Sequence, residues 1–131
     1  MSLDSVLARI DADIEKSTDR LLDLLRIRSI STDPAYAEDC QQAADWLVRD
    51  LKSLGAVATK RQTPGHPMVV GHVDGAGQHI LFYGHYDVQP VDPIELWNRD
   101  PFDPAVEQTP KGPVIRGRGS SDDKGQLMTF V

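Results

Sequence analysis

The stretch that decides the fold covers residues 79–90 and reads HILFYGHYDVQP. Its centre, from Ile80 to Tyr83, is an unbroken run of apolar and aromatic residues, which is typical of a strand buried on both faces of a sheet. His85 and Asp87 follow, and alternate residues of a strand point to the same face. We therefore expect the imidazole and the carboxylate to lie side by side, at the carboxyl end of a strand, where sites gather in open α/β sheets.

The rest of the chain alternates between helical and strand patterns. Apolar residues at helical spacing predict two long helices, from Leu3 to about Arg26 and from about Tyr36 to Leu54. Gly55 is expected to end the second helix, and a further helix is expected to begin at Lys124. The expected strands cover residues 56–61, 68–73, 79–85 and 114–116. Residues 89–113 are rich in proline and are expected to form a long loop. The mixture predicts an α/β domain built in layers.

The composition limits the possible functions. The chain has 131 residues, of which 40% are hydrophobic and 26% charged, as expected for one soluble globular domain. Its net charge of −6 argues against binding to nucleic acids or to anionic membranes. Cys40 is the only cysteine, so neither an internal disulfide nor a cysteine zinc site can form. Since we find no signal-peptide pattern and no apolar run long enough to span a membrane, we expect a cytoplasmic location.

A second group of polar residues lies within residues 117–125, which read GRGSSDDKG. One interpretation is helix capping, because serine and aspartate are favoured N-caps and acids suit the positive end of a helix. A cap needs only one such residue, however, and four stand in a row from Ser120 to Asp123. A phosphate-binding loop is excluded, because the pattern lacks the third glycine and the Gly-Lys-Ser/Thr ending. Carboxylates aimed into this loop would instead attract a divalent cation.

Together, His85 and Asp122 offer an imidazole and a carboxylate, each after an expected strand. A carboxylate has two oxygens and can bridge two cations about 3.5–4 Å apart, an arrangement that activates a water and polarises a carbonyl. His72 and Asp74 repeat the His-x-Asp pattern but run into a glycine-rich turn at residues 75–77. We interpret that second pair as an exposed structural pair. The interpretation of His85 and Asp122 as ordinary polar residues at the edge of the core stays open.

Residues 82–90 resemble the first signature of the zinc-dependent aminoacylase, carnosinase and desuccinylase family of amidohydrolases and exopeptidases. Trp97 with residues 100–102 resembles the spacer that follows, and residues 117–125 resemble the family's second signature. The leading helices and residues 28–31 are also similar to the family's N-terminal segment. The resemblance covers nearly the whole chain, and in its details it is closest to the dipeptidase and carnosinase-like branch.

The resemblance implies a three-layer zinc-exopeptidase-like catalytic domain, with a mixed sheet flanked by helices, of which residues 1–131 would form the N-terminal portion. It implies that His85 ligates one metal, that Asp122 bridges two metals, and that Asp87 is the catalytic carboxylate that holds the neighbouring histidine. Asp123 is not implied as a ligand. The expected cofactor is zinc, as two divalent cations per complete site, with cobalt or manganese as alternatives.

The family's general base, its remaining ligands and its lid domain have no counterpart in this sequence. The last residues, from Gln126 to Val131, are typical of the start of a helix or buried element. Because no cap, glycine or proline closes them, we expect the chain to be cut from a longer protein. The intact protein, with a homodimer as one possible state, is expected to hydrolyse the amide bond of a dipeptide or an N-acyl amino acid. This chain alone is expected to be inactive. The alternatives are a non-catalytic binding domain that keeps the fold and an interaction or structural role.

Overall fold

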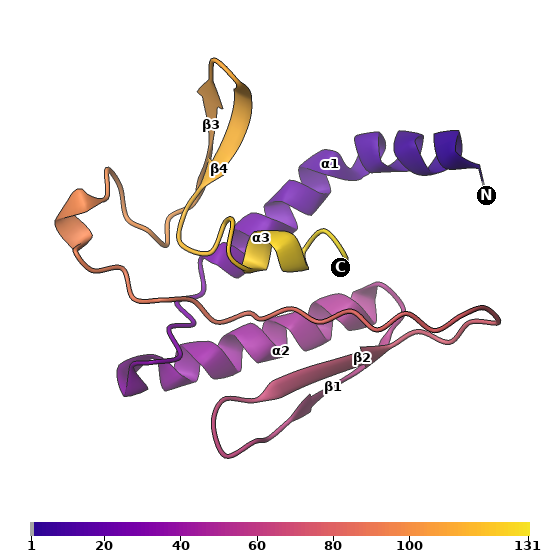
Figure 1. Ribbon diagram of the computed structural model, residues 1–131, viewed down its shortest axis with the longest axis horizontal. Helices are drawn as coiled ribbons and strands as arrows, with labels where there is room; N and C mark the ends of the chain where they lie inside the picture. Colours follow the sequence, from indigo (N-terminus) through magenta and orange to yellow (C-terminus); the bar gives the residue numbers. More distant parts are fainter. Residues whose placement is uncertain (1) are drawn as a thin grey trace.

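A computed structural model describes residues 2–131 and shows helices with short antiparallel hairpins (Figure 1). The helices are α1 (Leu3–Leu25), α2 (Ala37–Ser53) and the short α3 (Lys124–Leu127), with 3-10 turns η1 (Pro34–Tyr36) and η2 (Ile94–Leu96). Strands β1 (Val57–Arg61) and β2 (Met68–His72) form one antiparallel sheet, and β3 (Ala105–Thr109) and β4 (Gly112–Arg116) form another. The β1–β2 hairpin lies along α2, and the β3–β4 hairpin projects away from the helices (Figure 1).

Both long helices form where the sequence predicts them. α1 begins at a capping box, in which the Ser2 hydroxyl accepts from the N–H of Ser5 and the Ser5 hydroxyl accepts from the N–H of Ser2. α2 is followed, as predicted, by Gly55, whose φ of +91° lies in the left-handed region that disfavours a side chain. Charged residues recur along α1, and none of the helices described within residues 2–131 is both long and apolar enough to cross a membrane.

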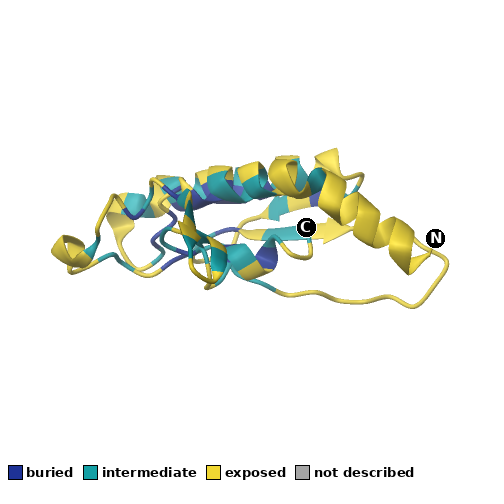
Figure 2. Ribbon diagram, turned by 90° about the horizontal axis from the view of Figure 1, so that it is seen from above, coloured by how far each residue is buried: buried dark blue, intermediate teal, exposed yellow. Residues whose placement is uncertain are grey.

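The core lies where the C-terminal end of α1 packs against α2 and α3. Its buried apolar cluster consists of Leu24, Ile27, Ala43, Leu47 and Leu127. The N-terminal half of α1 is exposed along its length (Figure 2), and the exposed residues include Ile10 and Ile14. The apolar stripe of α1 is therefore buried only near the end of the helix, next to the chain segments that carry the predicted site residues.

The hairpins agree with the predicted strands at residues 56–61 and 68–73, and they correct the expectation for residues 89–113. Part of that expected loop is β3, which pairs with β4 in a register that sets Glu107 opposite Val114. Pro104 and Pro110, which flank β3, hid this strand from the sequence pattern. Pro113 of β4 is tolerated because each strand of a two-stranded sheet has a free edge, where a missing N–H donor costs no ladder hydrogen bond.

The expectation of a buried strand over residues 79–85 is wrong. These residues run as an extended trace after β2 (Figure 1), and no strand within residues 2–131 pairs with them. Ile80 and Leu81 are 92% and 95% exposed. An apolar run is buried only where neighbouring strands and helices cover its two faces, and the described residues supply no such cover. Just after this segment, Val88 forms one isolated parallel β-bridge with Ile30.

Asp50→Ala is expected to lower the free energy of unfolding by about 2 kcal/mol. The Arg20 guanidinium donates to both carboxylate oxygens of Asp50, at 2.9 and 2.6 Å, and so ties α1 to α2. The two side chains are only 21% and 8% exposed, so the substitution leaves a largely buried arginine without its partner. Urea unfolding followed by circular dichroism measures the change. Asp13→Ala breaks an exposed pair with Arg9 and serves as the control, with an expected cost below about 0.5 kcal/mol. Equal losses in both variants would contradict a stabilising role for the buried pair.

Candidate metal centre

The first segment of the candidate site, residues 85–88, is held by the link that follows α1. The Ser29 hydroxyl donates to the carbonyl of Tyr86 at 2.7 Å, and the Ser29 carbonyl accepts the N–H of Val88 at 2.9 Å. The Ser31 hydroxyl donates to a side-chain oxygen of Asp87 at 2.6 Å. The segment is therefore fixed by hydrogen bonds to one turn, although it does not belong to a regular strand.

The imidazole of His85 lies between two carboxylates. Its Nδ1 is 3.0 Å from Oδ1 of Asp87, and its Nε2 is 3.2 Å from Oδ1 of Asp122. Burial alone disfavours the charged imidazole, but the charge and the hydrogen bond of Asp87 outweigh it, so the pKa of His85 is raised. The structure thus brings together the three residues that the sequence singles out, although Asp122 lies 37 positions after His85 in the chain.

The distance between His85 and Asp122 fits a pair of ligands to one cation. When Nδ1 donates its hydrogen to Asp87, the lone pair of Nε2 faces Asp122. Two such acceptors at 3.2 Å repel each other unless a proton or a cation lies between them. In a tetrahedral zinc site, bonds of about 2.0–2.1 Å place neighbouring ligand atoms about 3.3 Å apart. Among residues 2–131, no group of three His, Cys, Asp or Glu side chains could hold a metal ion, so His85 and Asp122 could supply only part of a ligand set.

The second segment, residues 117–124, is tied to the first by its own acids. Asp123, which was not implied as a ligand, accepts the backbone N–H of His85 at 2.8 Å. One acid of the pair faces the imidazole of His85, and its neighbour accepts the backbone N–H of the same histidine. The peptide bond between the two acids is cis. Sequence reasoning missed this role of Asp123, for which the only signal was the adjacent pair of acids.

The residues between the two segments pack the loop that connects them. The indole N–H of Trp97 donates to the carbonyl of Val91 at 3.0 Å. The guanidinium of Arg118 lies 5.2 Å above the centre of the Trp97 ring, and the backbone N–H of Arg118 donates to the carbonyl of Pro101 at 2.8 Å. Trp97 therefore positions the loop and has no described contact with His85 or its carboxylates.

Lys124 is a further residue at this site that the sequence did not reveal. Its side chain is fully buried, and its Nζ donates to the carbonyls of Leu24 at 3.0 Å and Ile27 at 2.7 Å. Burial lowers the pKa of Lys124 to about 7. The sequence offered only an indirect indication that a distant cation would bind here: α1 has no basic residue in its last turn, where a helix favours a cation.

The comparison pair, His72 and Asp74, lies on an exposed part of the chain, as predicted. Nε2 of His72 is 2.9 Å from Oδ1 of Asp74, and the two side chains are 53% and 94% exposed. The ring of His72 stacks on His79 with 5.9 Å between their centres. A His-x-Asp contact therefore forms in both places, and His85 differs by the carboxylate of Asp122 on its other side.

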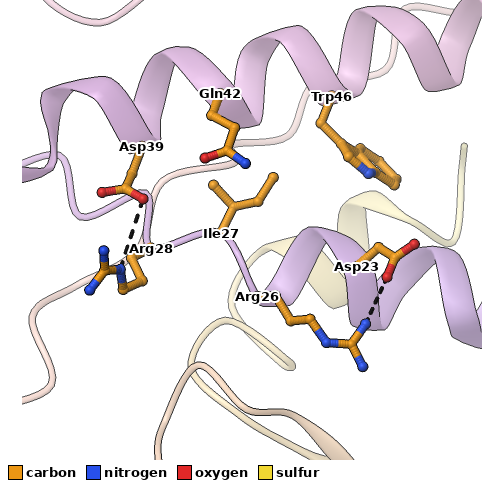
Figure 3. A pocket seen from close by; sticks show the side chains of 7 residues that line it. All are labelled: Asp23, Arg26, Ile27, Arg28, Asp39, Gln42 and Trp46. Atoms are coloured by element: carbon orange, nitrogen blue, oxygen red, sulfur yellow. Dashed lines mark hydrogen bonds and ion pairs between the residues drawn. The ribbon is translucent and has the colours of Figure 1, made fainter.

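A hollow of about 450 Å³ opens where α1 ends beside α2 (Figure 3). The charged residues that line it are paired with one another, Arg26 with Asp23 at 2.7 Å and Arg28 with Asp39 at 3.9 Å. Trp46 closes one side of the hollow. None of its lining residues belongs to residues 85–88 or 117–124, so the hollow is separate from the candidate metal centre.

Known proteins are similar to this chain in both sequence and fold. Residues 81–131 match the family model described as Peptidase family M20/M25/M40. The Cys-Gly metallodipeptidase dug1 of Schizosaccharomyces pombe is 33% identical over 143 aligned residues, which cover 100% of this chain and 29% of that protein. The solved structure of the di-peptidase Dug1p from Saccharomyces cerevisiae has a TM-score of 0.87 at 27% identity, over 98% of this chain and 29% of that one. Human carnosine dipeptidase 1 has a TM-score of 0.82 at 25% identity, with the same coverage.

The chain spans 29% of the length of each of these relatives. The matched residues 81–131 contain both segments of the candidate metal centre. The fold agreement extends over 98% of the chain, so the helices and hairpins that surround these segments are shared as well. The chain is therefore similar to peptidase family M20/M25/M40 over residues 81–131, and to metallodipeptidases in sequence and fold over nearly its whole length.

Proposed function

We propose that the intact protein is a metal-dependent hydrolase that cleaves an amide or peptide bond of a small substrate, with dipeptides as the main substrate class. The observation that carries the proposal is the imidazole of His85, whose Nδ1 lies against Asp87 while its Nε2 faces Asp122 at 3.2 Å. The similar proteins support it, since two of them are named a Cys-Gly metallodipeptidase and a di-peptidase. An N-acyl amino acid is the second substrate class that the same chemistry accepts.

In the proposed site, His85 and Asp122 hold the cations and Asp87 orients the imidazole. Two bound divalent cations, zinc foremost and cobalt or manganese as alternatives, would polarise the substrate carbonyl and lower the pKa of a bound water to about 7. Asp87 keeps the hydrogen of the imidazole on Nδ1, which leaves Nε2 as the ligand atom. Asp122 lies with one oxygen 3.2 Å from Nε2 of His85, and its carboxylate would bind the cations together with that imidazole. Asp123 keeps His85 in place through its backbone N–H.

Chelation of the purified intact protein is expected to abolish hydrolysis of the dipeptide Cys-Gly, because the cations supply most of the activation of carbonyl and water. Zinc, cobalt or manganese added back is expected to restore it. Release of free glycine measures the activity, with an N-acetyl amino acid as the parallel substrate. Hydrolysis that survives complete removal of the metal would contradict the proposal. Binding of a dipeptide without hydrolysis would favour the non-catalytic binding domain.

Residues 1–131 alone are expected to bind zinc weakly and to hydrolyse neither substrate. His85 and Asp122 would supply two ligands, whereas zinc takes about four, and the described residues contain no group of three His, Cys, Asp or Glu side chains that could hold a metal ion. Calorimetric titration of the 131-residue chain with zinc is the measurement. Tight binding of two zinc ions per chain would show that the described residues hold a complete site.

We also propose that the protein works in the cytoplasm. Cys40 is a free and fully buried thiol, and free thiols are typical of reducing compartments. The net charge of −6 in this chain disfavours adsorption to nucleic acids or anionic membranes. Immunodetection of the protein in soluble and membrane fractions of its cells tests this location.

A further inference from the structure

Lys124 is buried to 0% exposure, which is rare for a lysine because the ammonium loses its water on leaving the surface. Its hydrogen-bond partners are backbone carbonyls rather than carboxylates. Nζ donates to Leu24 at 3.0 Å and to Ile27 at 2.7 Å, across 100 and 97 positions of the chain. The carbonyl of Leu24 lies in the last turn of α1 and that of Ile27 lies two residues beyond the helix, and each also accepts a backbone N–H. Carbonyls at the end of a helix carry partial negative charge, so Lys124, when protonated, places a cation beside the last turn of α1, which has no basic residue of its own.

The same short stretch holds the other half of the metal centre. We call residues 24–31 the α1 exit. Ser29 and Ser31 of the α1 exit donate to the carbonyl of Tyr86 and to the carboxylate of Asp87, at 2.7 and 2.6 Å. Residues 85–88 and Lys124 are therefore attached to one common frame. The frame sets how far the two segments of the site lie from each other.

Apart from its contact with His85, few interactions hold the carboxylate of Asp122 in place. Its side chain is 83% exposed, and its described polar contact is with the imidazole of His85. Its position relative to that imidazole thus depends on the backbone that follows. Asp123 binds the backbone N–H of His85 at 2.8 Å, and Lys124 binds the α1 exit. Ligand groups need placement within about 0.5 Å to bind a metal well, so an anchor two residues away matters for affinity.

We propose that Lys124 is a positioning residue of the metal centre, which holds Asp122 at ligand distance from His85 by anchoring residues 122–124 to the α1 exit. This inference rests on the proposed function, since it assumes that His85 and Asp122 bind a cation. Lys124 touches neither the cation nor the substrate. It acts through the backbone that carries Asp122, in the way that groups behind the ligands tune other metal sites.

Titration of the metal-free intact protein with Co²⁺, followed by visible absorption, tests the inference. Lys124→Met keeps the length of the side chain but cannot bind the two carbonyls, and it is expected to weaken Co²⁺ binding about ten- to hundredfold and to alter the spectrum. Lys124→Arg keeps the charge and is the second variant. Because the charge is kept, the Lys124→Arg variant is expected to fold. Because the planar guanidinium fits these two carbonyls poorly, the variant is expected to bind Co²⁺ about tenfold more weakly. Leu47→Ala, in the core, is the control for lost stability, with Co²⁺ affinity and spectrum unchanged.

The outcomes separate this inference from the proposed function. If either folded Lys124 variant binds Co²⁺ as the unmodified protein does, while Asp122→Asn binds it weakly, the positioning role is overturned and the metal centre stands. If Asp122→Asn itself binds Co²⁺ normally, the proposed function fails. If Leu47→Ala weakens Co²⁺ binding as much as Lys124→Met at equal loss of thermal stability, the effect is general destabilisation and the inference fails. If neither Lys124 variant folds, Lys124 is a folding residue and the inference is likewise overturned.

Discussion

Asp122→Asn is expected to reduce kcat/KM for Cys-Gly in the intact protein about a thousandfold or more, which corresponds to a loss of about 4 kcal/mol of transition-state stabilisation. Asparagine keeps the size of the side chain and one oxygen but loses the negative charge, so it could not fill the proposed bridging role between two cations. The side chain of Asp122 is 83% exposed, so the substitution leaves the packing intact. Turnover of Cys-Gly and the zinc content of the purified variant measure the effect.

Asp74→Asn is the matched control for that experiment. It makes the same substitution in the other His-x-Asp pattern, where Asp74 contacts His72 at 2.9 Å on an exposed part of the chain. Its turnover and zinc content are expected to stay within about twofold of the unmodified protein, as is usual for surface substitutions. Near-normal turnover in Asp122→Asn would remove the bridging role and with it the chemical basis of the proposed hydrolase.

Features with local causes could be predicted from the sequence. α1 and α2 form where apolar residues recur at helical spacing, and Gly55 ends the second helix because only glycine adopts its φ of +91° without strain. The contact of His85 with Asp87 was expected because alternate residues of a strand share a face, and it forms between these close neighbours although the segment is not a regular strand. The approach of Asp122 could not be worked out from spacing across 37 positions, and it was expected through the resemblance of two separate signatures.

Features with distant causes could not be predicted. Lys124 is buried because two carbonyls about a hundred positions earlier accept its hydrogen bonds, and nothing near it in the sequence indicates them. The exposure of Ile80 and Leu81 likewise depends on distant parts of the chain. Their apolar character predicts burial, but burial depends on which elements lie against them, and a sequence pattern does not contain that information.

Gly125→Ala is expected to give the second large effect, because a side chain has no room at this position. An added Cβ would lie 1.9 Å from the carbonyl oxygen of Ser120 and 2.9 Å from its carbon. Both are backbone atoms, which cannot rotate away as a side chain does. The loop from Ser120 to Gly125 must therefore open, and Asp122 and Lys124 move with it. We expect a loss of about 3 kcal/mol or more in the free energy of unfolding, together with weaker Co²⁺ binding.

Gly77→Ala is the control for Gly125→Ala, since a Cβ at Gly77 meets no atom within 4 Å. Urea unfolding and Co²⁺ titration of the two variants separate the close approach at Gly125 from the general effect of replacing a glycine. The combination of the two measurements is informative, because the loop that fits tightly around Gly125 also carries the carboxylate that faces His85. If Gly125→Ala lowered stability without any change in Co²⁺ affinity, the position of Asp122 would be independent of this loop's packing. Parallel losses would instead show that the close packing of Ser120 against Gly125 is one of the contacts that define the metal centre.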